Sequence, residues 1–504
     1  MPHRYIKKIL EAKVYDVAIE TPVDEARFLS QRYNNNILIK REDLQPVFSF
    51  KLRGAYNKVS QLSAAQRARG VIAASAGNHA QGLALSGKQL GVQTVIVMPK
   101  TTPDIKVTSV KARGARVILH GDTYDEASAY SKKLAKEKGY TYVHPFDDMD
   151  VIAGQGTIGM EILRQVKGPL DTVFVPVGGG GLIAGVAAYI KYVRPEVKVI
   201  GVEAEDSACL YHALASGRRV VLPEVGLFAD GVAVAQVGKE TFRIAKECVD
   251  EVVLVNTDEI CGAIKDLFDD TRSIAEPAGA LAVAGLKKYV ETRRVKGKTL
   301  LAIDSGANVN FDRLRHISER SELGEKREAI IAVTIPEVPG SFKQFCSALG
   351  KRNITEFNYR YADEHEAQVF VGVQLSDGNN ERKALVAELR RQKYRVVDLT
   401  DNEMAKLHVR HLVGGHSPPG QNEVVFRFEF PERPGALMKF LQTLGHRWNI
   451  SLFHYRNHGA AYGRVMVGLQ MPEEEKALAE EYFRKIGYPF SEESDNQAYK
   501  IFLG

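Results

Sequence analysis

The chain has 504 residues, of which 44% are apolar and 26% are charged, so it is long enough for two or three folded domains. The net charge of +6 is small and the charges are interspersed, which argues against nucleic acid as a partner. No apolar run is long enough to cross a membrane, and the four cysteines lack the spacing of metal ligands. We therefore expect a cytoplasmic protein with reduced thiols, no metal site and no membrane partner.

Short apolar runs alternate with longer amphipathic runs through roughly the first 315 residues. The short runs are rich in β-branched residues, which is typical of parallel strands covered by helices on both faces. Strands are predicted at 70–75, 92–99, 116–121, 140–145, 172–177, 197–204, 251–256 and 298–308, with helices at 77–91, 103–114, 124–139 and 153–166. The pattern predicts one large α/β region, which we assign to residues 1–320.

The composition changes at residues 311–329, where charged residues dominate. We interpret this stretch as a solvated helix or a linker without a binding role, and we assign 321–329 as the linker between domains.

An internal repeat follows the charged stretch. The segment from Glu337 (EVPGSFKQFCSALGKRNITEFNYR) matches the segment from Glu432 (ERPGALMKFLQTLGHRWNISLFHYR) at an offset of 95 positions and later of 96. A strand pattern precedes each copy, and a further strand and a helix follow it. The repeat therefore predicts two small ferredoxin-like α+β domains, at residues 330–402 and 424–496.

Four consecutive glycines, Gly178–Gly181, follow the strand predicted at 172–177, and a helix is predicted to begin near Leu182. Glycines let backbone amides approach an anion closely, and the N-terminus of the helix adds a favourable dipole. A phosphate site is therefore expected here, with a glycine-rich turn that binds nothing as the alternative.

The same glycines also fit a different cofactor. Gly179, Gly181 and Ala184 match a relaxed dinucleotide fingerprint, and Glu203 lies near the distance expected for the acid that binds a ribose. A nicotinamide-dependent dehydrogenase is therefore a rival interpretation.

Three further features are left unexplained by a dehydrogenase. The loop SAGNHAQG, residues 75–82, and the turn at Ser305 both follow predicted strands, where ligands of open α/β sheets bind, although helix capping and an ordinary turn are the structural alternatives. Lys51, in SFKLRGA, is either a solvated charge or a nucleophilic amine in an apolar pocket. A phosphate site, an amine and two polar loops together describe a pyridoxal phosphate site.

The segments SFKLRGA, SAGNHAQG, GGGGL, AEPAGA and SGAN together resemble the fold-type II pyridoxal-phosphate enzymes, specifically the threonine dehydratases. The resemblance extends over essentially the whole chain, and the tandem repeats resemble the ACT-like regulatory domains of the biosynthetic form. It implies a catalytic domain of the tryptophan synthase β type with parallel sheets, followed by two ACT-like domains. The implied reaction is the first step of isoleucine biosynthesis: L-threonine is dehydrated and deaminated to 2-oxobutanoate and ammonia, and L-serine reacts more weakly to give pyruvate.

The resemblance also implies roles for individual residues. Lys51 would form a Schiff base with pyridoxal 5′-phosphate and, once freed, would remove the α-proton of the substrate. Asn78 would bind the ring 3′-oxygen, Ser305 would meet the ring nitrogen, and Ser75 would bind the substrate carboxylate. Glu276 either approaches the substrate or is simply an acid at the start of a helix. The phosphate would be held by Gly178, Gly179, Gly180, Gly181 and Leu182.

By the same resemblance, isoleucine would inhibit, valine would antagonise isoleucine, and the chain would form a homotetramer. Two other functions stay open: another fold-type II enzyme (threonine synthase, cysteine synthase or an amino-acid racemase) and an amino-acid sensor without catalysis. The candidate effector contacts, for which hairpin turns and core aromatic residues are the alternative, are Pro339, Gly340, Tyr359, Pro434, Gly435 and Tyr455.

Overall fold

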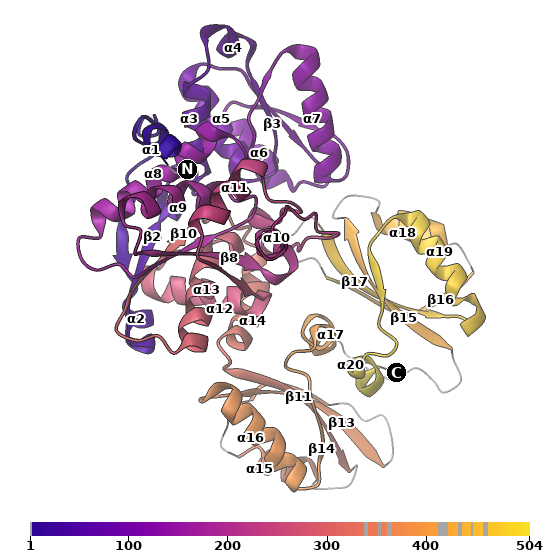
Figure 1. Ribbon diagram of the computed structural model, residues 1–504. Coiled ribbons are helices and arrows are strands. Elements are labelled where there is room, and N and C mark those ends of the chain that lie inside the picture. The colour runs from indigo at the N-terminus through magenta and orange to yellow at the C-terminus, as the bar shows by residue number, and fades with distance from the viewer. Residues whose placement is uncertain are drawn as a thin grey trace. The chain divides into compact units, whose positions relative to one another are not determined.

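The computed structural model describes residues 3–336, 341–350, 352, 354–359, 365–411, 422–431, 436–444, 447–456 and 462–503. The chain divides into two compact units, Met1–Ser321 and Glu322–Gly504 (Figure 1). We call them the catalytic unit and the regulatory unit and describe each by itself.

A six-stranded sheet forms the centre of the catalytic unit, in the order β1-β2-β10-β7-β8-β9, with only β1 antiparallel to its neighbour. Helices cover both faces, as the uncharged strand patterns predict. The strands are β1 (Val23–Glu25), β2 (Asn36–Arg41), β7 (Thr172–Pro176), β8 (Lys198–Ala204), β9 (Glu251–Val255) and β10 (Thr299–Asp304). One face is covered by α1 (His3–Leu10), α8 (Met149–Gln165), α9 (Gly181–Val193), α10 (Cys209–Ser216) and α11 (Lys239–Cys248), the other by α2 (Arg27–Tyr33), α12 (Thr257–Thr271) and α13 (Pro277–Arg293).

The second sheet of this unit is smaller and wholly parallel, in the order β5-β4-β3-β6. The alternating region thus forms two sheets, which agrees with the parallel sheets that the family resemblance implies. The strands are β3 (Val71–Ala74), β4 (Thr94–Met98), β5 (Arg116–Leu119) and β6 (Thr141–Tyr142), and the helices are α3 (Lys51–Ser60), α4 (Ala64–Arg69), α5 (Asn78–Leu90), α6 (Asp104–Ala112) and α7 (Tyr124–Lys138).

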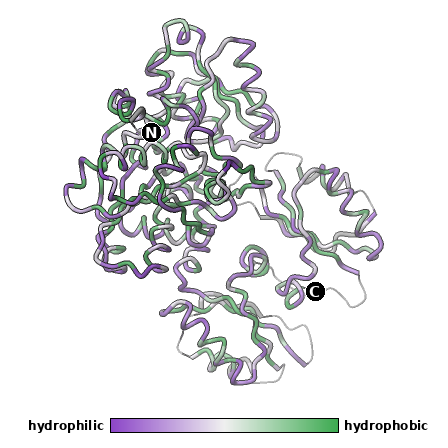
Figure 2. Tube along the Cα trace, viewed as in Figure 1, coloured by the Kyte–Doolittle hydropathy of each residue, from purple (hydrophilic) through white to green (hydrophobic). Residues whose placement is uncertain are grey.

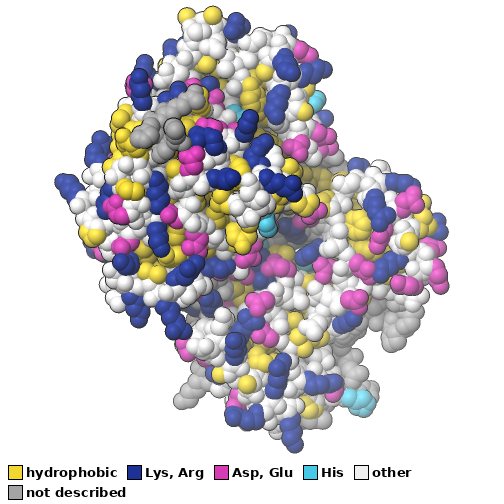
Figure 3. All heavy atoms as spheres, viewed as in Figure 1, with side chains coloured by type: hydrophobic (Ala, Val, Ile, Leu, Met, Phe, Trp, Pro, Cys, Tyr) yellow, Lys and Arg dark blue, Asp and Glu magenta, His cyan; other side chains and the backbone are white. Residues whose placement is uncertain are grey.

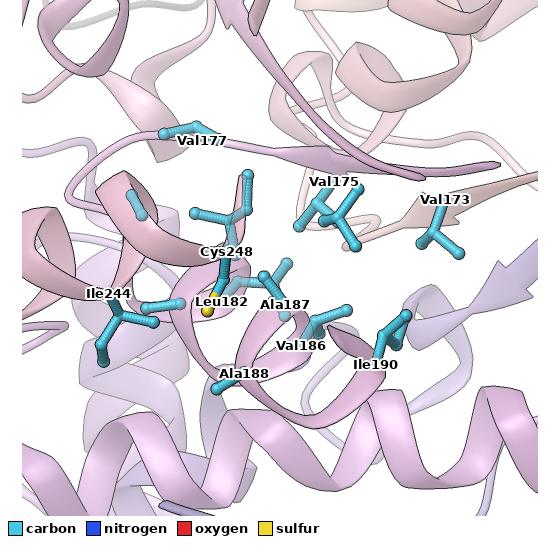
Figure 4. Packing of buried hydrophobic residues seen from close by; sticks show 14 of the residues in the cluster. Val173, Val175, Val177, Leu182, Val186, Ala187, Ala188, Ile190, Ile244 and Cys248 are labelled. Carbon is cyan, nitrogen blue, oxygen red and sulfur yellow. The ribbon is translucent and has the colours of Figure 1, made fainter. Parts of the chain in front are cut away.

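The core between β7 and α9 shows why these segments fold as they do. Valines at alternate positions of β7 face α9, and the apolar residues of α9 are buried against them and against α11 (Figure 4). The apolar segments of Figure 2 follow these strands and helices through the catalytic unit. The C-terminal end of β7 and the N-terminus of α9 are therefore rigidly placed; Gly178, Gly179 and Gly180 lie between them, and Gly181 begins α9.

The regulatory unit contains two antiparallel four-stranded sheets, in the orders β12-β13-β11-β14 and β16-β17-β15-β18. Each has ferredoxin-like topology, which confirms the predicted repeat. The first comprises β11 (Glu328–Pro336), α15 (Ser341–Ala348), β12 (Ile354–Tyr359), β13 (Glu366–Gln374), α16 (Gly378–Arg391) and β14 (Arg395–Asp398). The second comprises β15 (Glu423–Pro431), α18 (Ala436–Leu444), β16 (Asn449–Arg456), β17 (Tyr462–Gln470), α19 (Lys476–Ile486) and β18 (Phe490–Glu492).

Each repeat also ends in a short helix that the sequence patterns did not predict, α17 (Glu403–Leu407) and α20 (Gln497–Phe502). The N-cap residues of these helices meet, because Asn402 Nδ2 donates to Asn496 Oδ1 at 3.1 Å. Apolar residues from both repeats share one core cluster. The two repeats therefore pack together as one body.

Helix α14 (Arg313–Gly324) corrects our interpretation of the charged stretch. Arg313, His316 and Arg320 are each less than 10% exposed, and Ile317 is buried in the core of the catalytic unit. The solvated interpretation is wrong for these residues. The interpretation took a high content of charged residues to mean exposure to solvent. A charged side chain can be buried in a packed helix when it is paired or hydrogen-bonded.

The described residues contain neither a membrane-spanning helix nor a group of side chains suited to bind a metal ion. Among the residues described, no helix combines the length and the apolar content that a membrane crossing requires. Nor does the described part of the chain bring three or more acidic, histidine or cysteine side chains together as metal ligands. Positive and negative side chains are interspersed on the face seen in Figure 3.

Candidate active site

Lys51 is the first residue of α3, and its amine is directed into the catalytic unit. Nζ donates a hydrogen bond to the carbonyl oxygen of Gly231 at 3.2 Å. Burial lowers the pKa of Lys51 from its ordinary value, while the carboxylates of Glu276 and Asp230 oppose that shift. A fully solvated lysine would have neither property, so the surface interpretation is wrong.

Gly231 belongs to segment 227–232, which borders several parts of the site. A Cβ placed on Gly231 would lie 3.6 Å from Oε1 of Glu276, and a Cβ placed on Gly178 would lie 2.9 Å from the Cα of Val232. The segment therefore touches the lysine, an acid and the first glycine of the glycine loop, Gly178–Gly181.

The carbonyls of the glycine loop are bound from outside the site. Gly178 O accepts from Cys209 Sγ at 3.4 Å, and Gly179 O accepts from Thr241 Oγ1 at 2.8 Å. In a trans peptide the C=O and the following N–H point in opposite directions. The N–H groups of Gly179 and Gly180 are thus turned away from these partners, as an anion site requires.

The same loop leaves no space for side chains. A Cβ on Gly179 would lie 2.2 Å from the ring of Phe146, and Gly180 has φ +91°, in the left-handed region that favours glycine. Helix α9 begins at Gly181, and Leu182 is buried directly after it. Loop and helix together have the backbone geometry that an anion site needs, and phosphate binding by these residues stays a prediction.

Asn78 and Glu276 form a buried pair beside segment 227–232. Asn78 Nδ2 donates to Glu276 Oε1 at 2.5 Å, and Asn78 Oδ1 accepts from Asn308 Nδ2 at 2.7 Å. Asn308 thereby sets which way the amide of Asn78 points. Burial raises the pKa of Glu276, and Asp230 adds to the shift, although the bond from Asn78 opposes it. Glu276 precedes α13 but makes no side-chain capping bond to it; the described bond of its carboxyl is the one from Asn78.

Ser75 and Ser305, the two serines predicted to contact substrate and cofactor, each follow a strand of the catalytic unit. Ser305 follows β10, and its Oγ donates to Ala278 O at 3.2 Å. Its own carbonyl accepts from Phe50 N at 3.3 Å, one residue before the lysine. Ser75 Oγ accepts from Gly77 N at 3.3 Å, a local bond in the loop that leads to α5.

A buried ion cluster lies beneath the first turn of α3. Arg53 is fully buried and forms paired bonds to Glu42, at 2.8 Å each, and to Glu161, at 2.6 and 3.0 Å. Lys40, also fully buried, donates to Glu161 at 2.7 Å. Two cations and two anions therefore balance, and the arginine two residues after Lys51 is held in place.

Glu203 argues against the dehydrogenase interpretation. Its two carboxylate oxygens accept from the backbone N–H groups of Leu210 at 2.9 Å and Tyr211 at 2.8 Å, in the first turn of α10. The acid that the dinucleotide fingerprint assigned to a ribose is thus used to hold a helix N-terminus.

Glu203 should make the stability of the chain depend on pH. Burial raises the pKa of Glu203 to about 7, against the opposing bonds from α10. The folded state then holds this proton more tightly than the unfolded chain, so the free energy of unfolding falls by about 3 kcal/mol as pH rises from about 4.5 through 7. Glu203→Gln should remove this part of the pH dependence in urea titrations at pH 5, 6 and 7. Glu205→Gln, at an exposed carboxylate two residues later, is the control and should keep it.

The predicted effector residues lie mostly outside the described residues. Pro339, Gly340, Pro434 and Gly435 are among the residues that the structure does not describe, and Tyr359 and Tyr455 are described only as backbone positions of β12 and β16. Their part in effector binding stays a prediction.

Sequence reasoning did not find segment 227–232 or Asn308. The segment has no periodicity, and its only signal is the Asp230-Gly231 pair, which is typical of any turn. Asn308 is the last residue of the SGAN motif, residues 305–308, but its bond to Asn78 joins residues 230 positions apart. Neither contact is visible without the tertiary structure.

Two family models match the chain. Residues 14–306 match the pyridoxal-phosphate dependent enzyme family, and residues 319–409 and 415–503 match the C-terminal regulatory domain of threonine dehydratase. The second model matches twice in tandem, over the two repeats of the regulatory unit.

Individual relatives agree with these matches. The biosynthetic L-threonine dehydratase IlvA of Burkholderia multivorans is 58% identical over 504 residues, and that of Escherichia coli is 55% identical over 499, with 97–99% of each chain covered. The solved structure of threonine deaminase isoform 2 from Solanum lycopersicum has a TM-score of 0.63 at 51% identity and covers 64% of this chain and 88% of that one. Maize serine racemase has a TM-score of 0.59 at 30% identity, over 62% and 95%. The chain therefore belongs to the biosynthetic threonine dehydratases, a family of pyridoxal-phosphate-dependent enzymes.

Proposed function

We propose that the chain converts L-threonine to 2-oxobutanoate and ammonia, and that L-serine reacts more slowly to give pyruvate. The observation that carries this proposal is the amine of Lys51, whose pKa is lowered by burial and which contacts the segment that borders the glycine loop. The residues fit pyridoxal phosphate, because an amine, a loop with N–H groups available to an anion and an amide donor surround one segment.

The reaction divides between the cofactor and the side chains. Pyridoxal phosphate, when bound, supplies the electron-withdrawing carbonyl and ring that weaken the α-C–H bond of an amino acid. Lys51 would hold the cofactor through its amine and, as a neutral amine, would accept the α-proton. Ser75 and its loop would bind the substrate carboxylate. Asn78, oriented by Asn308, gives one amide hydrogen to Glu276, and its second amide hydrogen would serve the ring oxygen. The α-hydrogen and the β-hydroxyl leave as water and a second water releases ammonia, so the reaction needs no oxidant or reductant.

A racemase or a synthase on the same catalytic fold is not favoured. The regulatory family match extends over the two repeats, and the family that carries it is named for threonine dehydratase.

The first test is a visible spectrum of the purified chain followed by an assay with L-threonine. We expect a visible band from the cofactor joined to a lysine, and formation of 2-oxobutanoate and ammonia in equal amounts. L-Serine should give pyruvate at a lower kcat/KM. A band without any oxo acid from threonine would contradict the proposed reaction while leaving the cofactor in place.

For regulation, we propose isoleucine as the inhibitor and valine as its antagonist, in a homotetramer located in the cytoplasm. The match of both repeats to the regulatory domain of threonine dehydratase supports amino-acid effectors, and the shared core would let the repeats respond together. The cysteines Cys209, Cys248, Cys261 and Cys346 form no disulfide, which suits a reducing compartment.

Trp448 allows the proposed effectors to be tested without following turnover. It is the only tryptophan of the chain, is 7% exposed, and lies in the core of the second repeat, where Nε1 donates to Glu475 at 2.7 Å. Isoleucine should change its fluorescence over the same concentrations that reduce 2-oxobutanoate formation, and valine should displace the curve. Inhibition without a change in Trp448 fluorescence would argue for a site outside the regulatory unit.

A further inference from the structure

Helix α14 holds segment 227–232 through one buried arginine. Arg313 Nη1 donates to Phe228 O at 2.9 Å, and Nη2 donates to Leu227 O at 3.3 Å. Nη1 also lies 3.5 Å from Oδ1 of Asp230. The Arg313 side chain is only 7% exposed, so three neighbouring groups of the segment are fixed by one rigid, planar guanidinium.

A second contact of α14 falls on the same segment. The ring of His316, one turn after Arg313, lies edge-on to the ring of Phe228, with 5.6 Å between centroids. Phe228 packs against the core cluster that contains Ile317. A displacement of the first two turns of α14 therefore moves the segment as well.

The segment acts directly on the catalytic amine. Gly231 O accepts the hydrogen bond from Lys51 Nζ, and Asp230 attracts the charged form of the same amine. Lys106 of α6 also forms an ion pair with Asp230 at 2.6 Å. The segment is therefore linked to a helix of the smaller sheet as well.

Chain connectivity places α14 directly before the first strand of the regulatory unit. The helix ends at Gly324, and β11, the first strand of the regulatory unit, begins at Glu328, so three residues separate them. Such a short connection transmits displacement of a strand to a helix with little slack.

We infer that Arg313 is a positioning residue that couples the regulatory unit to the catalytic amine: movement of α14 shifts segment 227–232 and with it the Gly231 carbonyl on Lys51. The inference rests on the proposed function, in that isoleucine is the probe. It predicts that the coupling, and not effector binding itself, depends on Arg313.

The test compares Arg313→Met with Arg315→Met in the full-length holoenzyme. Arg315 is on the same helix, but its side chain is 77% exposed and pairs with Glu319 of the same helix at 2.9 Å. In Arg313→Met we expect isoleucine still to change the fluorescence of Trp448, whereas its inhibition of threonine turnover weakens by about tenfold, within the usual range of coupling factors. Arg315→Met should be inhibited like the unmodified chain.

A measurement without turnover checks the same coupling. L-2-Aminobutanoate has the carbon skeleton of threonine but no hydroxyl to eliminate, and by linkage it should shift the isoleucine midpoint seen by Trp448 in the unmodified chain. The shift should vanish in Arg313→Met and persist in Arg315→Met. Unchanged inhibition and an unchanged shift in Arg313→Met would overturn the inference, as would equal losses in both variants.

Two results would require another variant or another probe: an Arg313→Met chain that does not fold, and an unmodified chain that isoleucine does not inhibit. If Arg313→Met does not fold, Arg313→Lys takes its place: it keeps the charge but loses the planar fork, so partial uncoupling is expected and full coupling would overturn the inference. If isoleucine does not inhibit the unmodified chain, the proposed effector is wrong. Arg313 is then judged by amide hydrogen exchange at 227–232, which should be faster in Arg313→Met than in Arg315→Met; equal rates would contradict the link.

Discussion

Replacing Lys51 by alanine is expected to lower 2-oxobutanoate formation by about three to four orders of magnitude. By the roles proposed for Lys51, the variant loses the covalent anchor of the cofactor and the base for the α-proton. The carbonyl of Gly231, to which the amine donates, cannot act as a base. The visible band of the lysine-bound cofactor should disappear. A small amine such as ethylamine, added to the assay, should restore part of the rate, because removal of the side chain leaves room for it.

Lys58→Ala provides the matched control. Lys58 is on the same helix and pairs with Asp148 at 2.8 Å and Asp150 at 3.2 Å, away from segment 227–232. Its activity and spectrum should stay within a few-fold of the unmodified chain. Steady turnover by Lys51→Ala with the parent spectrum would show that another group performs the chemistry.

Arg53→Met should lower the free energy of unfolding of the catalytic unit by about 3–5 kcal/mol, because it leaves buried carboxylates without their main partner. The guanidinium of Arg53 is fully buried and uses its donors on Glu42 and Glu161, and also on Thr157 Oγ1 at 3.1 Å and Ile19 O at 3.2 Å. Methionine matches the length of the side chain, so the loss reports on charge and hydrogen bonds more than on a cavity.

The pH dependence separates this explanation from a simple packing defect. Burial by itself would raise the pKa of Glu42, but attraction from Arg53 overcomes it and lowers that pKa below its usual range. A depressed carboxyl pKa contributes stability at neutral pH that is lost as pH falls through the acid range. In Arg53→Met this contribution is absent, so the difference between variant and parent should shrink on acidification. Glu42→Gln added to Arg53→Met should recover part of the loss.

Urea unfolding followed by two probes is the measurement. Circular dichroism reports on the whole chain, whereas Trp448 fluorescence reports on the regulatory unit alone. The variant should show an earlier transition by circular dichroism with a smaller change at Trp448. An unchanged midpoint would mean that the buried charges of this cluster contribute no net stability.

Periodicity in the sequence predicted those elements whose burial pattern is local. The helices expected at 77–91 and 124–139 are α5 and α7, each closed by a glycine in the left-handed conformation, and the strand at 172–177 is β7. The ferredoxin-like repeats followed from similarity between two parts of the chain, and the structure confirms their topology. The signals are strong here because a buried face repeats every two or 3.6 residues.

The wrong prediction for the charged stretch arose because its side chains are paired with residues that are distant in the sequence. Helix α14 was interpreted as solvated because it is rich in charge, yet Arg313 and Arg320 are buried through bonds to segment 227–232 and to Asp258. The bonds that decide this join residues at least 62 positions apart. No local window of sequence contains both partners.

By itself the sequence determined the α/β class of the first unit, the tandem repeats, and the residue types of a pyridoxal phosphate site, because these depend on periodic burial and on glycines and side chains that each follow a strand. Only the tertiary structure decided that the amine of Lys51 donates to Gly231 O, that Glu276 accepts from Asn78, and that Glu203 holds α10 and not a ribose. These contacts depend on which segments, distant in the sequence, pack against one another and exclude water. That environment, and not the identity of the residue, sets the pKa and the direction of each functional group.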